Sequence, residues 1–418
     1  MEVNIPYGKE IVKVNIPEPC EILNPNKIEI KDEEKTVEDA LRNPIGMGSF
    51  KKFVKNSDRL LVIVNDASKP TPTSRILEHI YPYISNHPDL KFLVATGTHR
   101  PPNVEECRFI FGRLYDIFKD QISIHDSKKE VNMKYLGKTK SGTELFINKM
   151  VYDYENVIVI GSVEPHYFAG YTGGRKAFFP GVSSYKTVEM NHGFALSDKA
   201  CSLCLKDNPV HNDMIDSIKF LKDVNIFSIQ TVLTSDYKIY ATKCGDIIES
   251  FEAATKYAND VYCVPVQKKS NIIVTVSPYP MDINLYQSQH ALENAKLVLD
   301  EGGILILVSK CRMGVGSDAF LEILSKANSP QDVLYLHNGK YKLGSHKSFR
   351  ILKITAIADV FAVTDLDNET IEKAKFKPYS NIQSAINDAE KIIKGRGKEP
   401  NIAVIPSGNL TVPLIFKN

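Results

Sequence analysis

The sequence lacks the features that would place it in several broad classes of protein. No run of apolar residues approaches the ~20 needed to cross a bilayer, so we expect no membrane-spanning helix. Charge of one sign is not in excess either. The 52 basic and 50 acidic residues leave a formal net charge of +2, which argues against binding of nucleic acid or of a membrane surface. Residues 1–6 resemble no signal peptide, so we expect a cytoplasmic protein.

Cysteine is scarce as well. Seven cysteines are scattered through the chain, so we expect no framework of disulfide bonds. One pair, Cys201 and Cys204, has the spacing of a redox or metal site, but no second pair is present to complete a zinc site. We expect these two residues to be semi-buried free thiols. A redox or metal-handling role is the alternative.

Alternating strand and helix patterns fill most of the chain. The continuous apolar segments 60–64, 92–95 and 157–160 indicate strands covered on both faces, which is typical of a parallel sheet. Helical spacing follows the second of these strands, from residue 103 to 118. Residues 226–241 differ, because two strand-like runs flank a turn and predict a hairpin.

A second alternating block begins near residue 271 and ends with an apolar strand at 402–405. The polar segment before it contains a proline and predicts a connector between domains. We therefore predict an α/β protein of two domains, each with a mostly parallel sheet flanked by helices. The predicted bounds are residues 1–267, for a domain that anchors a ligand and carries the chemistry, and residues 271–418, for a second α/β domain.

Unusual residues follow the predicted strands, at the ends where ligands collect in open α/β sheets. They lie in residues 65–72 (NDASKPTP), 95–101 (ATGTHRP) and 163–176 (VEPHYFAGYTGGRK). Two of these loops contain a histidine, a residue that suits proton transfer because its ordinary pKa is ~6.5. Histidine is also a common ligand of nickel, copper and zinc. No pair of histidines is spaced to hold a metal with protein ligands alone.

The lysine that ends the third loop, Lys176, has two interpretations. It could bind phosphate as a point charge, or it could anchor a ligand covalently. A P-loop requires glycine directly before the lysine and a hydroxyl residue directly after it. Arg175 and Ala177 occupy those positions here, which argues against a nucleotide-hydrolysing P-loop.

Taken together, these loops resemble the nickel-dependent lactate racemase family. The matching strings occur in the family's order and extend over essentially the whole chain. They lie at residues 95–101, 164–176, 180–187, 191–192, 209–214, 279–282 and 286–287.

The resemblance implies a particular cofactor. This is a nickel pincer nucleotide, a pyridinium-3,5-bisthiocarboxylic acid mononucleotide that holds nickel through two sulfurs and a ring carbon. The resemblance implies a thioamide link to Lys176 and a nickel ligand at His192, and soft sulfur and imidazole ligands suit nickel. Further cofactor contacts are implied at Asp66, Thr71, Gly173 and Gly174.

The resemblance also implies a mechanism. His99 and His166 would act as acid and base on opposite sides of a small 2-hydroxy acid. One histidine takes the hydroxyl proton while the hydrogen of the α-carbon moves to the cofactor as a hydride. The planar 2-keto acid that remains can take the hydride back on its other face. The site is expected in a cleft between the two domains.

The chain departs from the lactate enzymes where the substrate is read. Lys69 stands where those enzymes have an arginine, and His290 stands where they have a lysine. The chain also contains no tryptophan, whereas those enzymes place one at the substrate pocket. We therefore predict a 2-hydroxy acid racemase or epimerase whose substrate is not lactate. Its substrate contacts are expected at Lys69, Tyr286, Gln287 and His290.

Two other functions compete with this prediction. A protein that only carries or stores the nickel nucleotide would need Lys176 and His192, but not the two acid–base histidines. A hydrolase without redox chemistry is a weaker alternative. The cofactor itself would come from the enzymes that synthesise it, which are the expected protein partners.

Overall fold

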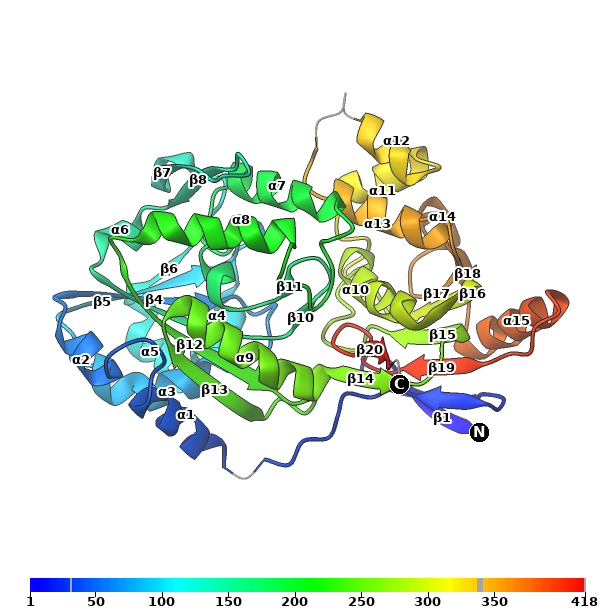
Figure 1. The fold of residues 1–418 in the computed structure, drawn as a ribbon, viewed down its shortest axis with the longest axis horizontal. Helices are drawn as coiled ribbons and strands as arrows, with labels where there is room; N and C mark the ends of the chain where they lie inside the picture. The colour runs from blue at the N-terminus through cyan, green and yellow to red at the C-terminus, as the bar shows by residue number, and fades with distance from the viewer. Residues whose placement is uncertain (31, 337–340, 417–418) are drawn as a thin grey trace. The chain divides into compact units, whose positions relative to one another are not determined.

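A computed structural model describes residues 1–30, 32–336 and 341–416. The chain forms two compact units (Figure 1). One unit contains residues 27–261, and the other contains residues 1–26 together with residues 262–418. We call them the central unit and the terminal unit.

The predicted domain bounds therefore need one correction, because residues 1–26 belong with the C-terminal residues. The reason is a strand pairing between distant parts of the chain. Strand β3 (Cys20–Ile22) pairs in parallel with β19 (Ile402–Ile405) and forms an edge of the terminal sheet.

The central unit contains a six-stranded sheet in the order β13-β12-β9-β4-β5-β6. All neighbours pair in parallel except β12 and β13, which form the predicted hairpin. The strands are β4 (Arg59–Asn65), β5 (Asp89–Ala95), β6 (Ile122–Ile124), β9 (Asn156–Ser162), β12 (Asn225–Leu233) and β13 (Ile239–Gly245).

Both faces of this sheet are buried, as the continuous apolar runs predict. Along β4, Leu60, Val62 and Val64 pack into one hydrophobic core, while Leu61 and Ile63 pack into another on the opposite face. Each of these side chains is at most 1% exposed. Full burial of such a side chain contributes about 2 kcal/mol, so the strand is held strongly between two layers of helix.

Helices cover the two faces of the central sheet (Figure 1). Those that pack into the first core are α1 (Glu33–Arg42), α2 (Phe50–Lys55), α3 (Thr73–Ile84), α4 (Val104–Phe111) and α5 (Tyr115–Phe118). Elements on the other face include α6 (Met150–Asp153), α8 (Pro209–Ile218) and the start of α9 (Ile247–Tyr262). Helix α7 (Tyr185–Gly193) contacts α8 and the hairpin of β7 (Met133–Lys138) and β8 (Glu144–Asn148).

The helix predicted over residues 103–118 is interrupted. Asn103 caps α4, and its side chain and that of Glu106 form a reciprocal capping box. Gly112 then adopts φ +57°, a conformation that glycine tolerates and a continuous helix does not. The chain passes through a tight turn at Gly112–Leu114 before α5.

The terminal unit contains a second six-stranded sheet, in the order β18-β17-β16-β15-β19-β3, with every pair parallel. Its remaining strands are β15 (Ser270–Val276), β16 (Leu299–Val308), β17 (Asp359–Val363) and β18 (Lys377–Tyr379). A smaller parallel pair joins β14 (Cys263–Val266) to β20 (Val412–Ile415).

One face of the terminal sheet packs against helices and the other against a hairpin and a helix. The first face is covered by α10 (Leu285–Ala295), α11 (Asp318–Lys326), α12 (Pro330–Tyr335), α13 (Ser345–Thr355) and α14 (Asn368–Lys373). The second is covered by α15 (Ile382–Gly395) and by the antiparallel strands β1 (Glu2–Tyr7) and β2 (Glu10–Asn15).

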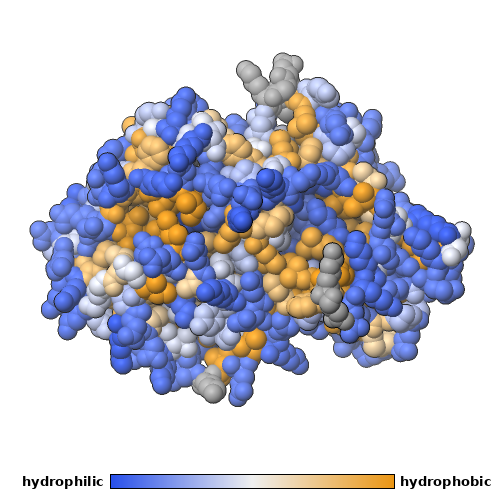
Figure 2. Space-filling view, in the orientation of Figure 1, coloured by the Kyte–Doolittle hydropathy of each residue, from blue (hydrophilic) through white to orange (hydrophobic). Residues whose placement is uncertain are grey.

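The surface carries mostly hydrophilic residues on the face drawn in Figure 2, with apolar residues in separate patches. This distribution agrees with burial of the apolar runs in the cores of the two units. Within the part of the chain that the structure describes, no helix is both long enough and apolar enough to cross a membrane.

Candidate functional site

The three unusual loops predicted from the sequence follow neighbouring strands. Strands β9, β4 and β5 lie side by side in parallel, so their carboxyl ends meet at one edge of the central sheet. Residues 66–72 follow β4, residues 96–101 follow β5, and residues 163–176 follow β9. Residues far apart in the sequence are thereby brought to one place, where α/β sheets bind ligands.

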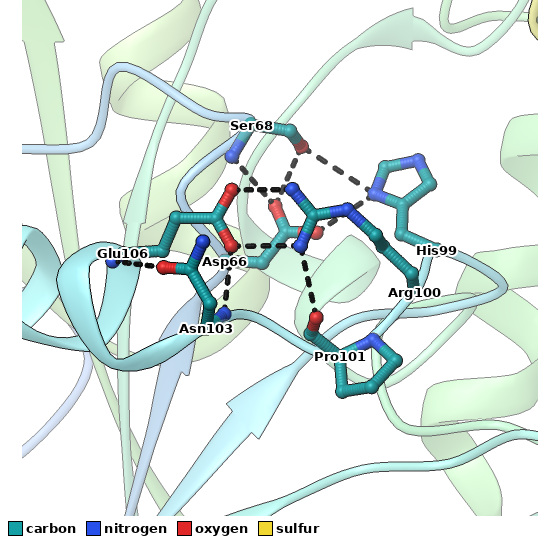
Figure 3. Close-up of polar contacts among 7 residues, drawn as sticks. All are labelled: Asp66, Ser68, His99, Arg100, Pro101, Asn103 and Glu106. Atoms are coloured by element: carbon teal, nitrogen blue, oxygen red, sulfur yellow. Dashed lines mark hydrogen bonds and ion pairs between the residues drawn. The ribbon is translucent and has the colours of Figure 1, made fainter.

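An aspartate–histidine pair joins two of these loops (Figure 3). Oδ2 of Asp66 lies 2.7 Å from Nδ1 of His99. The other carboxylate oxygen of Asp66 accepts hydrogen bonds from the hydroxyl and the backbone N–H of Ser68, at 2.6 Å and 3.2 Å. The carboxylate side chain is 9% exposed, whereas the imidazole is 42% exposed. The buried carboxylate thus holds His99 through Nδ1, while part of the imidazole ring is exposed to solvent.

The Asp66 carboxylate is kept in its charged form. Burial alone would raise the pKa of Asp66, but the hydrogen bond and charge of His99, the Ser68 hydroxyl and the charge of Lys69 together lower it below its ordinary value. An ionised carboxylate only accepts hydrogen bonds, so the hydrogen of His99 lies on Nδ1. Nε2 is then the ring nitrogen that can accept a proton.

The loop that carries His99 is also fixed on its other side. The guanidinium of Arg100 donates to both carboxylate oxygens of Glu106, at 2.8 Å and 2.6 Å (Figure 3). Glu106 belongs to the capping box at the start of α4. The residue next to His99 is thus attached to the first turn of a helix, and a paired fork of this kind fixes direction as well as distance.

Short hydrogen bonds connect the loops to one another. The hydroxyl of Thr71 lies 2.8 Å from the hydroxyl of Ser162 at the end of β9, and it accepts a hydrogen bond from the Asn65 side chain at 2.7 Å. The N–H of Gly97 donates to the carbonyl of Gly181 at 2.9 Å. Thr71, where the family resemblance implies a cofactor contact, therefore joins the β4 loop to the end of β9.

His166 lies in a small hairpin, which we call the His166 hairpin (residues 165–171). Strands β10 (Pro165–His166) and β11 (Gly170–Tyr171) form it. His166 is 8% exposed, and its Nδ1 faces the backbone N–H groups of Ala169 and Phe168, at 3.3 Å and 3.5 Å. Because Nδ1 accepts there, the hydrogen lies on Nε2. His99 and His166 thus have opposite tautomers.

Two glycines shape the bend before Lys176. Gly173 and Gly174 have φ of +80° and +51°. A Cβ on Gly173 would lie 2.6 Å from Oε1 of Gln230, and one on Gly174 would lie 2.7 Å from Cβ of Phe251. Only glycine fits this path. The bend then continues as a tight turn, Gly174–Ala177.

Arg175 is a structural residue that the sequence reasoning did not identify. Its guanidinium is buried, donates to the carbonyls of Ala169 and Tyr171 at 2.8 Å and 3.0 Å, and lies 4.2 Å from the centre of the Phe251 ring. Burial lowers the pKa of Arg175 to about 9. Because it binds one carbonyl in the turn and one on β11, Arg175 holds the second half of the His166 hairpin in place. A lone arginine in a glycine-rich segment gave no signal of this role.

Lys176 lies in an environment that favours the neutral amine. Burial lowers the pKa of Lys176 well below its ordinary value, and the charges of Lys69 and Arg175 lower it further, while Glu164 opposes them. A neutral amine is nucleophilic, whereas an ammonium is not. This environment suits a covalent anchor better than a phosphate grip, which requires the charged form.

The ring of Phe168 lies close to three of the predicted site residues. The centre of its ring lies 4.5 Å from that of His166, 5.1 Å from that of His192 and 5.8 Å from Nζ of Lys176. His192 is in the last turn of α7 and is partly exposed. The sequence did not identify Phe168, because its contacts form only when the hairpin is folded.

Among the described residues, no three histidine, cysteine, aspartate or glutamate side chains gather to hold a metal ion. A metal ion at His192 would need further ligands from a bound molecule.

The remaining predicted residues belong to the terminal unit. Tyr286, Gln287 and His290 lie on α10, with Tyr286 and His290 one turn apart and hence on the same side of the helix. Nζ of Lys347 lies 4.1 Å from the centre of the Tyr286 ring. Lys69, by contrast, belongs to the β4 loop of the central unit.

The expectation for Cys201 and Cys204 was wrong. The two residues are joined by a disulfide, with their Cα atoms 5.4 Å apart, and are not free thiols. Both lie between α7 and α8 and are partly exposed.

Two family domains and two curated relatives match this chain. The lactate racemase N-terminal domain matches residues 7–202, and the lactate racemase C-terminal domain matches residues 265–412. The chain is 30% identical to a lactate racemase of Thermoanaerobacterium thermosaccharolyticum, over 97% of each chain. It is also 30% identical to a lactate racemase of Lactiplantibacillus plantarum, over 90% of each.

Two solved structures also share the fold of this chain. The apoprotein of the lactate racemase from T. thermosaccharolyticum superposes with a TM-score of 0.88 at 27% identity, covering 99% of this chain and 100% of that one. A protein of Thermotoga maritima shares the fold, with a TM-score of 0.69 at 14% identity, over 93% and 100% of the two chains. Because both family domains and the full-length relatives match, this chain belongs to the lactate racemase family.

Proposed function

We propose that the protein is a racemase or epimerase of a 2-hydroxy acid that uses a nickel pincer nucleotide attached to Lys176. The observation that carries the proposal is the meeting of three loops at one edge of the central sheet. They present a carboxylate-backed histidine, a buried histidine and a lysine of lowered pKa. Membership of the lactate racemase family supports the same reaction.

The residues present fit such a cofactor. Lys176 offers a neutral amine for covalent attachment, and His192 offers an imidazole close to the same phenylalanine. Gly173 and Gly174 pack closely against Gln230 and Phe251, and this close packing fixes the path of the chain that leads to the lysine. When bound, the cofactor would supply a site that takes the hydrogen of the substrate α-carbon as a hydride and returns it.

The two histidines then divide the proton transfers. Nε2 of His99 is the acceptor nitrogen, because Asp66 fixes the hydrogen on Nδ1. Nε2 of His166 carries a hydrogen, because Nδ1 accepts from the hairpin backbone. His99 is therefore prepared to act as base while His166 acts as acid, and each must exchange roles in the reverse direction.

The substrate would be bound by its carboxylate. Lys69 lies in the same loop as Asp66, and its charge contributes to the lowered pKa values of both Asp66 and Lys176. A lysine is a point charge and does not make the paired fork of an arginine. With His290 on α10 in place of a lysine, we propose a preferred substrate other than lactate.

Cofactor attachment and turnover test the proposal separately. The protein would be produced with the enzymes that synthesise the nickel nucleotide, and the peptide that contains Lys176 would be analysed by mass spectrometry. We expect an added mass on Lys176 and nickel in stoichiometric amount. Unmodified Lys176 in nickel-replete protein would refute the cofactor assignment.

Loaded protein would then be incubated with a panel of chiral 2-hydroxy acids, with optical rotation or NMR as the readout. We expect interconversion of the two configurations of at least one acid, and slower conversion of lactate. Loading without conversion of any acid would instead favour a carrier of the nickel nucleotide. Conversion of lactate faster than all others would refute the altered specificity.

A further inference from the structure

The connection between α7 and α8 contains the disulfide between Cys201 and Cys204. Its two cysteines are partly exposed, so a small thiol can reach them. Leu203 and Asp207 within this connection have φ of +66° and +61°, which is uncommon for residues other than glycine. The disulfide therefore closes a strained and accessible segment.

This segment is attached to the His166 hairpin by several contacts. The N–H of Leu203 donates to the carbonyl of Gly170 at 3.1 Å, and Gly170 is the residue paired with His166. The side chain of Asn208 donates to the carbonyls of both Phe168 and Cys204, each at 2.9 Å. The backbone approaches so closely that a Cβ on Gly170 would clash with the carbonyl oxygen of Cys204.

We propose that Cys201 and Cys204 form a reversible dithiol–disulfide site whose oxidation state determines how firmly the His166 hairpin is held. In the oxidised form the bond fixes the position of the carbonyl of Cys204 and the N–H of Leu203, which contact the hairpin. In the reduced form the two residues separate and these contacts loosen. The proposal concerns only the contacts that hold the hairpin, so it does not require the reaction proposed above.

The chemistry requires a low-molecular-weight disulfide as oxidant. One cysteine thiolate attacks it, forms a mixed disulfide and releases one small thiol. The second cysteine thiolate then attacks the protein sulfur, forms the bond between Cys201 and Cys204, and releases the second small thiol. Two electrons and two protons pass from the protein to the small disulfide, and an excess of the small thiol reverses both steps.

The effect should be local. A disulfide that closes a loop of a few residues constrains the unfolded chain far less than one that closes a long loop. The hairpin also keeps the hydrogen bonds from Arg175 to Ala169 and Tyr171 when the disulfide is reduced. We therefore expect a change in the hairpin and not unfolding of the central unit.

The redox reaction is tested first. The full chain would be equilibrated in mixtures of oxidised and reduced glutathione, free thiols would be trapped with iodoacetamide, and the peptide with residues 201–204 would be analysed by mass spectrometry. We expect both cysteines to become alkylated together as the mixture becomes reducing. Alkylation in even the most oxidising mixture, or resistance in the most reducing one, would overturn the proposal.

Coupling to the hairpin is tested by hydrogen exchange of the same samples. We expect the amides of residues 166–172 to exchange several-fold faster in the reduced form, and the variants Cys201→Ser and Cys204→Ser to exchange at that faster rate in every mixture. Cys107→Ala, which changes a buried free cysteine of the same unit, should respond like the parent chain. Equal exchange of the hairpin in both forms of the parent chain would contradict the coupling.

Discussion

Each unit places an aspartate after one strand and its partner after the neighbouring strand, but the partners differ in kind. In the central unit Asp66 follows β4 and contacts His99 after β5, at 2.7 Å. In the terminal unit Asp282 follows β15 and contacts Arg312 after β16, at 2.8 Å. An arginine stays charged throughout the working range of pH, whereas a histidine gains and loses a proton within it. The same strand geometry thus gives a permanently charged pair in one unit and, in the other, a pair whose histidine can exchange a proton.

The largest expected effect is the loss of the anchor in the central unit. In Lys176→Ala no amine remains to form the thioamide, so we expect no added mass, no bound nickel and no detectable turnover. Intact-mass spectrometry and metal analysis measure this. Lys186→Ala, which changes an exposed lysine paired with Glu144, should load and react normally. Full turnover by Lys176→Ala would show that the anchor lies elsewhere.

Replacement of the two members of the Asp66–His99 pair should have graded effects. We expect His99→Ala to lower kcat by ~10²–10⁴, because a positioned base is removed. Asp66→Asn keeps the imidazole of His99 but no longer fixes its tautomer, and we expect kcat to fall roughly 10- to 100-fold.

The tautomer gives this comparison a readout besides turnover. Nitrogen-15 NMR of the protein without cofactor should place the hydrogen of His99 on Nδ1 in the parent chain. In Asp66→Asn it should show a mixture of the two neutral tautomers. Asp116→Asn, at an exposed aspartate paired with Arg108, is the control. An unchanged tautomer in Asp66→Asn would remove Asp66 from this role.

Replacement of Arg312, the partner of Asp282 in the terminal unit, should change the stability of the protein and not its reactivity. Arg312→Met leaves the carboxylate of Asp282, which is 0% exposed, without its charged partner. We expect the free energy of unfolding to fall by roughly 3 kcal/mol, measured by urea denaturation. The reactivity of Lys176 toward an amine reagent should not change. A loss of Lys176 reactivity in Arg312→Met would contradict the expectation that this pair affects only the stability of the terminal unit.

A smaller effect is expected on the choice of substrate. Lys69→Arg with His290→Lys restores the two side chains that the lactate enzymes carry at these positions. We expect kcat/KM for lactate to rise about tenfold, equivalent to about 1.4 kcal/mol of binding in the transition state. The ratio of lactate to the preferred acid is the quantity to measure. No change in that ratio would show that these two positions do not set specificity.

The smallest expected effect is a dependence of stability on pH. The pKa of Lys176 is lowered in the folded protein, while in the unfolded chain it returns to about 10.4. Between these two values the unfolded chain binds a proton that the folded chain does not, so stability should increase as the pH rises toward 10. Urea denaturation of Lys176→Met without cofactor should show a shallower increase than the parent chain. Identical curves would contradict the lowered pKa.

Runs of apolar residues in the sequence predicted the buried strands and the loops that follow them. Strands such as β4 were visible because every residue from Leu60 to Val64 is apolar, and the loops followed from the strand ends. The break in the helix at Gly112 was missed, because a single glycine is tolerated in many helices. The joining of β3 to β19 was also missed, since the two strands lie hundreds of residues apart.

Parts of the site also depended on contacts that spacing does not reveal. His99 and Asp66 were identified separately, but nothing in the sequence indicated that they pair. Cys201 and Cys204 have the same spacing whether they are free or bonded, and the bond follows from the path of the backbone between α7 and α8. Phe168 and Arg175 lie within the matching string at residues 164–176, yet their contacts appear only when the hairpin is folded.

The strand β3 has a consequence for the order in which the protein is made. A ribosome produces residues 20–22 long before their partner strand β19, residues 402–405. The central unit lies between them in sequence and can fold as soon as residue 261 is available. The terminal unit must wait, with its first strands unpaired to the main sheet. A fragment of residues 262–418 would leave the edge of β19 exposed, and such edges promote association between chains.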